Sequence, residues 1–199
     1  THCKDTIDYL VQTAMRAGTN VTRPAGRAGT VNIVQNATDY LKATMVRQAV
    51  TKLRARAAVP RDGQFYVGVL HPNVIHDLRE ETRSGSWRVP SEYGQSQSQI
   101  WNGEFGEFEG VRWVSTATAF RAADNDGATS AKVHRGFILG REAMGKAVVS
   151  DPTTVMSPIT DKLQRWRGLG WKADLDYKVY RNESLERLEA TSSIDATAV

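Results

Sequence analysis

Cysteine is almost missing from this sequence, and so are the features of secreted and membrane proteins. Cys3 is the only cysteine among 199 residues, which excludes an internal disulfide and a zinc site built on thiolates. We expect it to be an inert thiol in a reducing compartment. No apolar run comes near the roughly 18 residues that a membrane helix needs, and no signal peptide is visible. The sequence therefore favours a protein that neither carries disulfides nor enters a membrane.

Catalytic motifs are also absent. There is no G-x-S-x-G or H-E-x-x-H motif and no Cys–His arrangement, and the carboxylates are scattered too widely to nominate a general acid and base. Residues 140–147 match the G-x-x-x-x-G-K part of a phosphate-binding loop. However, Ala147 stands where a hydroxyl must hold Mg²⁺, and Glu142 would place a carboxylate against the phosphates. We therefore expect a short helix over 141–145, no catalytic residue and no cofactor.

Two histidines near acidic residues raise the possibility of a metal site. His71 and His76 stand close to Asp77 and Glu80. A spacing of five residues turns the two rings apart by roughly 140° on a helix, whereas helical metal pairs use i, i+4. We expect His71 at a corner between a strand and a helix, His76 on a half-exposed face, and no metal.

What the sequence does contain is typical of a globular protein with local excesses of positive charge. Apolar residues make up 40% and charged residues 24% of the chain, and the net charge is only +4. Two stretches are basic, and their members are Lys42, Arg47, Lys52, Arg54, Arg56 and Arg61 in the first and Arg165, Arg167 and Lys172 in the second. Such clusters can attract phosphates or can form solvated faces and ion pairs between subunits. A nucleic-acid-binding α+β domain that uses residues 42–61 therefore remains an alternative.

Apolar periodicity predicts three helices. The first covers residues 5–17 and ends at Gly18. The second covers 38–57, with Asn36 or Thr38 as its N-cap. The third begins at Pro72, which is favoured at the first helical position.

Strands are predicted between and after these helices. Residues 65–70 form a nearly continuous apolar run, which is typical of a strand buried on both faces. Shorter candidates lie at Val21 and at 31–34, 111–115 and 137–139. Residues 171–179 alternate apolar and charged side chains, which indicates a half-buried strand. Residues 82–98 and 121–131 are expected to be polar loops, and the tail beyond Leu188 is expected to be frayed.

Six segments resemble, in the same order, the major capsid proteins of tailed bacteriophages in the phage N4-related group. They are residues 5–8 with 16–21, 38–39 with 46–55, 66–72 with 77–79, 100–112, 140–145 and 169–172. The most specific of them is the strand that runs into the corner at His71 and Pro72. Together they extend over nearly the whole chain, from about residue 5 to about residue 190.

The resemblance implies an α+β fold of the Hong Kong-97 type. That fold has a peripheral domain, built on a spine helix and a β-sheet, and an axial domain that meets its neighbours around the five- and six-fold axes. Residues 1–36 would then be peripheral, 37–150 mostly axial, and 151–199 strands that return to both. By this resemblance, the family's N-terminal arm and the extended loop before the spine helix would not be part of these 199 residues.

The implied function is structural and not enzymatic. The resemblance implies self-assembly, in the cytoplasm of a host bacterium, into the pentamers and hexamers of an icosahedral head that encloses double-stranded DNA. The expected partners are other copies, packaged DNA, and portal, scaffold or decoration proteins. The candidate residues for contacts between subunits or with DNA are Arg47, Lys52, Arg54, Arg56, Arg61, Trp87 and Tyr93. Reversing the charge of Arg54 and Arg56 together is expected to impair assembly more than folding.

Overall fold

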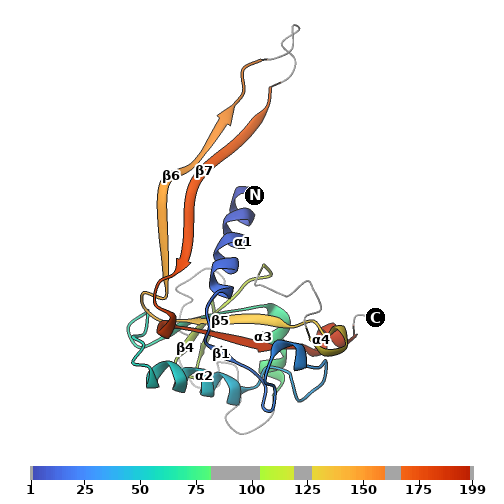
Figure 1. The fold of residues 1–199 in the computed structure, drawn as a ribbon. Coiled ribbons are helices and arrows are strands. Elements are labelled where there is room, and N and C mark those ends of the chain that lie inside the picture. The colour runs from blue at the N-terminus through green and yellow to red at the C-terminus, as the bar shows by residue number, and fades with distance from the viewer. Residues whose placement is uncertain (1, 82–103, 119–126, 160–166, 198–199) are drawn as a thin grey trace.

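A six-stranded mixed sheet forms the centre of the protein. The computed structural model describes residues 2–81, 104–118, 127–159 and 167–197. The strand order is β1-β8-β5-β2-β4-β3, in which β1 pairs parallel with β8, β2 pairs parallel with β4, and the other pairs are antiparallel. The bounds are Val21–Thr22 (β1), Tyr66–Leu70 (β2), Glu104–Phe108 (β3), Val111–Ser115 (β4), His134–Leu139 (β5) and Leu185–Ala190 (β8). The predicted mixed α+β class is confirmed (Figure 1).

Within the described residues, four α-helices and three short 3-10 turns accompany this sheet. The α-helices are α1 (His2–Arg16), α2 (Ala43–Ala55), α3 (Pro72–Glu80) and α4 (Ser193–Thr197), and the turns are η1 (Thr30–Asn32), η3 (Ala128–Ser130) and η4 (Asn182–Ser184). Helices α2 and α3 bury their apolar faces in the larger core, together with Tyr66 and Trp113 from the sheet. A smaller core, which includes Met15 and Phe137, lies where the end of α1 meets the sheet. Successive strand residues point to opposite faces, so Phe137 in the smaller core and Ile138 in the larger one place the two cores on opposite sides of β5.

A long two-stranded ribbon projects from the sheet. Strands β6 (Met144–Met156) and β7 (Leu169–Val179) pair antiparallel, and α1 lies alongside β7 (Figure 1). Side chains of β7 alternate between half-buried and exposed from Ala173 to Val179, as the sequence predicted, whereas Trp171 and Lys172 are both exposed. The N-terminal end of α1 is held to the ribbon by Trp171, whose Nε1 donates a hydrogen bond to Nδ1 of His2 over 3.2 Å.

Several predicted elements are confirmed. Helix α1 falls where the apolar period of residues 5–17 placed it, β2 falls within 65–70, and α3 begins at Pro72. Strands β4 and β5 contain the candidates at 111–115 and 137–139. The polar loop at 82–98 and most of the loop at 121–131 lie outside the described residues.

The predicted start of the second helix is wrong. Helix α2 begins at Ala43 with Lys42 as its N-cap residue, and not after Asn36 or Thr38. The Asn36 side chain instead accepts hydrogen bonds from the backbone N–H groups of Thr38 and Asp39. An asparagine that bonds to the backbone two residues further on forms a turn, which competes with helix formation.

Residues 31–34 do not form the predicted strand. They overlap η1, which leaves Val31 exposed and Ile33 buried. The short helix predicted over 141–145 is also wrong. Glu142 has a φ of 60°, in the left-handed region, and β6 begins at Met144. A left-handed residue cannot continue a right-handed helix, so this segment is a tight turn between β5 and β6.

The prediction of a frayed tail beyond Leu188 is wrong as well. Strand β8 lies between β1 and β5 in the sheet, and the side chains of Glu189, Thr191 and Ser192 are fully buried. The segment can be polar and buried because Glu189 is paired with Arg23 and Arg135, and Asp195 with His134, all from distant parts of the chain. A local sequence pattern cannot reveal such partners.

Candidate subunit interface

The basic residues of α2 are largely paired with carboxylates of the same chain. Nη2 of Arg47 lies 2.8 Å from Glu109, which follows β3, and this hydrogen bond and charge raise the pKa of the Arg47 guanidinium. Arg56 forms an ion pair with Glu186 in β8, and Nζ of Lys52 lies 3.8 Å from the same carboxylate. Glu186 is buried, so these two cations neutralise a charge inside the fold.

Arg54 and Arg61 are exposed, as Arg47 and Lys52 are, but they form no ion pair with a carboxylate among the described residues. Burial raises the pKa of the Tyr66 phenol, and the charge and hydrogen bond of Arg54 oppose that shift. Arg54 therefore lies next to Tyr66, on the solvent-exposed side of α2. Trp87 and Tyr93, the aromatic candidates, lie outside the described residues, so their role stays a prediction.

Replacing Arg56 with glutamine is expected to lower the free energy of unfolding by about 1.5 kcal/mol, because a hydrogen bond to a buried charged group is lost. The loss stays moderate because Lys52 and Thr22 still contact Glu186. Arg54→Gln, the matched control, is expected to change stability by less than about 0.5 kcal/mol. Equilibrium urea unfolding followed by circular dichroism measures both. Equal effects of the two variants would contradict the role of Arg56 in the fold.

The ion pair between Arg56 and Glu186 changes what a charge reversal of Arg54 and Arg56 together would test. A glutamate at position 56 would stand beside Glu186, so folding would be disturbed together with any contact between subunits. A variant at Arg54 alone separates the two effects, because its side chain is exposed and makes no ion pair with Glu186 among the contacts of the described residues.

The projecting ribbon exposes apolar side chains that the sequence alone did not single out. The residues exposed on β6, β7 and the following turn are Val148, Val149, Val155, Met156, Leu169, Trp171 and Tyr180. An open hollow of about 430 Å³ lies near the far end of the ribbon, lined in part by Val155, Leu169 and Trp171. Two-stranded ribbons are marginally stable in water on their own. Contacts with another surface would therefore stabilise the far end of the ribbon.

The alternation in 171–179 was the available signal for this surface. It identified one apolar face, but it could not show that α1 covers only part of it. The described part of α1 also exposes Tyr9 and Leu10, at 62% and 42% of their full accessibility. Single exposed apolar residues are ordinary, whereas a group on one projecting element marks an interaction surface.

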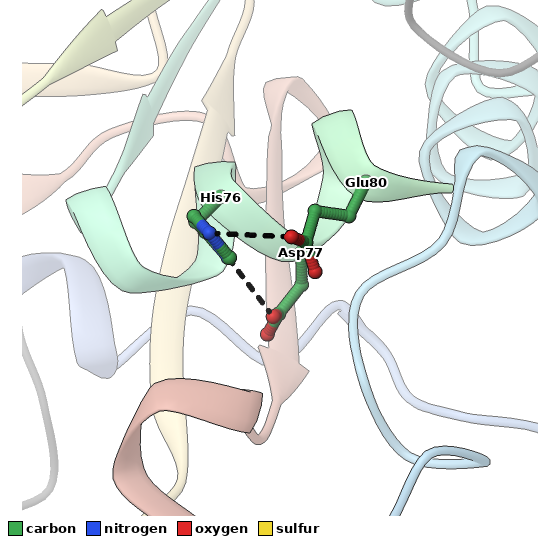
Figure 2. A group of neighbouring side chains, drawn as sticks. All are labelled: His76, Asp77 and Glu80. Carbon is green, nitrogen blue, oxygen red and sulfur yellow. Dashed lines mark ion pairs between the residues drawn. The ribbon is translucent and has the colours of Figure 1, made fainter. Parts of the chain in front are cut away.

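The histidine and acidic residues of α3 form a surface group (Figure 2). His76 lies 3.5 Å from Glu80 and 3.7 Å from Asp77. Both oxygens of Asp77 also accept hydrogen bonds from Ser193, one from its backbone N–H and one from its hydroxyl. Asp77 therefore caps the N-terminus of α4, and the group has a structural explanation.

His71 takes no part in that group. Its Nδ1 accepts a hydrogen bond from the backbone N–H of Asn73, which makes it the N-cap of α3. Its ring lies against His134, with the ring centroids 4.8 Å apart. The predicted place of His71 at the corner between strand and helix is confirmed, and so is the predicted half-exposed position of His76.

None of the helices in the described ranges combines the length and the apolar character of a membrane span. The segment that resembles a phosphate-binding loop forms the turn from β5 into β6, with the backbone N–H groups of Gly140 and Arg141 donating to carbonyls of Ser184 and Val59. These donors serve the fold and do not form a cradle for phosphates. The geometry thus presents surfaces for association, and the strongest is the exposed apolar ribbon.

Comparisons with known proteins agree with an associating subunit. The solved structures that resemble this chain include the capsid of Ralstonia phage GP4, at 17% identity and a TM-score of 0.63, over 89% of this chain and 53% of that one. A structure from Mycobacterium phage Che8 matches at 13% identity and a TM-score of 0.58, over 92% and 57% of the two chains. The capsid of the cyanophage P-SCSP1u matches at 15% and 0.55, over 95% and 61%.

At these identities the likeness concerns the fold, and the chain spans little more than half the length of the first solved chains it matches. A search among curated proteins gave no match. A family described as phage capsid protein matches residues 9–179, which is most of the chain and contains the second half of α1, the ribbon and every strand of the central sheet except β8. The matched segment ends with β7, and β8 follows it. By this match the chain belongs to the phage capsid protein family, whose members are structural proteins of the virion.

Proposed function

We propose that this chain is the shell-forming part of a major capsid protein with the Hong Kong-97-type fold, of the kind found in N4-related phages. Its copies assemble into the pentamers and hexamers of an icosahedral head around double-stranded DNA. The family match carries the proposal, and the exposed apolar ribbon supports it, because a shell subunit must offer different surfaces to successive neighbours. Assembly in the bacterial cytoplasm, with portal, scaffold or decoration proteins as further partners, belongs to the same proposal.

We also propose a division into two domains. Helix α1 and the ribbon form the peripheral domain, and the six-stranded sheet with α2 and α3 forms the axial domain. The boundaries expected from the sequence, at residues 36 and 150, stay predictions. The pairing of β1 with β8 favours an earlier first boundary, and the unbroken strand β6 over Met144–Met156 favours a second boundary before it.

The ion pairs of α2 argue against the alternative function of nucleic-acid binding through residues 42–61. Arg47, Lys52 and Arg56 are each engaged by a carboxylate of the chain, which leaves less positive charge for phosphates. A weak, non-specific attraction to packaged DNA fits this arrangement better than a dedicated binding site.

Expression of the full-length protein that contains this chain tests the proposal. Negative-stain microscopy and sedimentation are expected to show closed particles of uniform size. Leu169→Lys on the ribbon is expected to abolish particles while circular dichroism stays unchanged, because a charge would enter the apolar contact. Val31→Lys, which changes an equally exposed residue in η1, is the matched control and is expected to assemble. A full-length protein that stays monomeric and binds DNA in a salt-dependent way would refute the proposal.

A further inference from the structure

The protein consists of two units that meet at one place. The outer unit is α1 with the β6–β7 ribbon, and the sheet unit is the six-stranded sheet with α2, α3 and α4 (Figure 1). The chain passes between the two units three times, at residues 17–20, 140–143 and 180–184. All three crossings lie at the same end of the ribbon and together form one joint between the units (Figure 1).

Asn182 ties two of these crossings together through its side chain and its backbone. Its Oδ1 accepts a hydrogen bond from the backbone N–H of Thr19 over 3.1 Å, and its Nδ2 donates to the Thr19 hydroxyl over 2.6 Å. Its backbone carbonyl accepts from Nδ2 of Asn20 over 2.6 Å. One residue of the link from β7 to β8 thus holds the segment that leaves α1.

Arg187 holds the same segment from the sheet. Its Nη1 donates to the carbonyls of Arg16 and Gly18, over 2.5 Å and 3.3 Å. Carbonyls at the end of a helix lack partners within the helix, and a cation there also complements the helix dipole. Nε of Arg187 lies 3.0 Å from the buried carboxylate of Glu189, so this ion pair attracts the guanidinium toward the sheet.

Close packing completes the joint. A Cβ atom at Gly18 would lie 2.5 Å from Cδ2 of Leu185, so the chain passes directly over the start of β8. Leu185 also belongs to the smaller core with Met15 and Phe137. Rotation of α1 against the sheet would therefore have to break the bonds of Asn182 and Arg187 and disturb this packing at the same time.

We propose that Asn182 and Arg187 form a clasp that sets the angle between the outer unit and the sheet unit. The lever is long. The 13 residues of β6 extend for about 40 Å, so a rotation of about 10° at the clasp would move the far end of the ribbon by about 7 Å. A shift of that size would separate packed side chains. If the chain forms shells, as proposed above, the clasp also sets the curvature at which neighbouring copies fit.

The angle can be measured on this chain without any assembly. Cys3 is the only cysteine and lies in α1, and Gln48→Cys adds a second label on the exposed face of α2. Double electron–electron resonance spectroscopy with spin labels at these two positions measures the distance between the two units. Helix α1 has 15 residues and is about 22 Å long, so a rotation of about 10° moves its first residues by about 4 Å.

The wild-type chain is expected to show one narrow distance distribution. Asn182→Ala is expected to broaden or shift it, and Asn182→Asp is expected to preserve it, because the carboxylate can still accept from the N–H and the hydroxyl of Thr19. Asn36→Ala, which removes an asparagine turn within the sheet unit, is the matched control and should leave the distribution unchanged. Thr19→Val, which removes only the hydroxyl contact, replaces Asn182→Ala if that variant does not fold.

A distribution in Asn182→Ala or Thr19→Val that equals the wild-type distribution would overturn the clasp. This outcome is independent of the proposed function, since it concerns the geometry of one chain. In the full-length protein, a clasp variant is expected to give particles of altered or uneven diameter. Absence of particles from the wild type would count against the proposed function and leave the resonance result standing.

Discussion

Replacing Glu189 with glutamine is expected to lower the free energy of unfolding by about 3–5 kcal/mol, because removal of one partner leaves buried charges without compensation. The Glu189 side chain is fully buried. One of its oxygens accepts from Nε of Arg23 over 2.7 Å and from the Thr30 hydroxyl over 2.8 Å. The other oxygen lies 3.0 Å from Nε of Arg187 and 3.6 Å from Nε of Arg135.

The pKa of Arg187 depends on the carboxylate of Glu189. Burial lowers the pKa of the Arg187 guanidinium, and the neighbouring charges of Arg135 and Arg23 lower it further, while Glu189 raises it. A glutamine at position 189 keeps the shape of the side chain and removes the one influence that favours the charged guanidinium. The cost therefore comes from electrostatics and not from a cavity.

Equilibrium urea unfolding of the variant, followed by circular dichroism, measures this cost. Glu142→Gln is the matched control, because Glu142 is 58% exposed and its nearest cation, Arg141, lies 4.0 Å away. Exposed pairs of this kind contribute about 0–1 kcal/mol. Equal stability of the Glu189 and Glu142 variants would show that the arginines around Glu189 are solvated in the folded protein.

Replacing Trp113 with alanine is expected to cost about 3–5 kcal/mol, as for other large aromatic side chains that are removed from a core. Trp113 is fully buried and stands in β4 directly opposite Gly68 in β2. A Cβ atom at Gly68 would lie 2.3 Å from Cε3 of the indole and 2.8 Å from Cγ1 of Val111. The indole therefore occupies the space that a side chain at position 68 would need.

This shared space predicts a specific coupling. Gly68→Ala alone is expected to cost about 1–3 kcal/mol through overpacking. In the double variant with Trp113→Ala, the new methyl group enters space that the indole has left, so the combined cost should fall below the sum by about 0.5–3 kcal/mol. Gly170→Ala, where nothing lies within 4 Å, is the control and should show no loss. Strict additivity, measured by urea unfolding, would contradict this account of the β2–β4 contact.

Local patterns predicted the elements whose burial follows a regular period. The apolar residues of α1 recur along one helical face, β2 is apolar on both faces because it lies in the middle of the sheet, and Pro72 opens α3. In each case the residues that decide the structure are neighbours along the chain.

The wrong predictions arose where a local alternative or a distant partner decided the outcome. The Asn36 side chain accepts a hydrogen bond from the backbone N–H of Thr38 in a turn, so α2 begins at Ala43 and not at residue 38. Glu142 adopts a left-handed conformation, which prevents the helix predicted over 141–145 after β5. In β8 no apolar period marks the strand, because Glu186 and Glu189 are neutralised by residues more than a hundred positions away.

The candidate interface divides in the same way. The sequence located the basic residues of α2, but their pairing with Glu109 and Glu186 depends on how β3 and β8 are placed in the sheet. It also revealed the apolar alternation of β7. It did not reveal that β6 would be the partner of β7, that the ribbon would project, or that α1 would leave part of it exposed.

The sequence by itself determined that this is an α+β protein without disulfides or catalytic motifs, and it supplied the helices, the central strand and the resemblance to phage capsid proteins. Only the tertiary structure decided which charges are buried, which apolar residues remain on the surface, and how the outer unit is held against the sheet. The physical reason is how far apart along the chain the interacting residues lie. Periodicity acts between residues within a few positions of each other, whereas the bonds of Asn182 to Thr19 and of Glu189 to Arg23 join segments more than 160 residues apart.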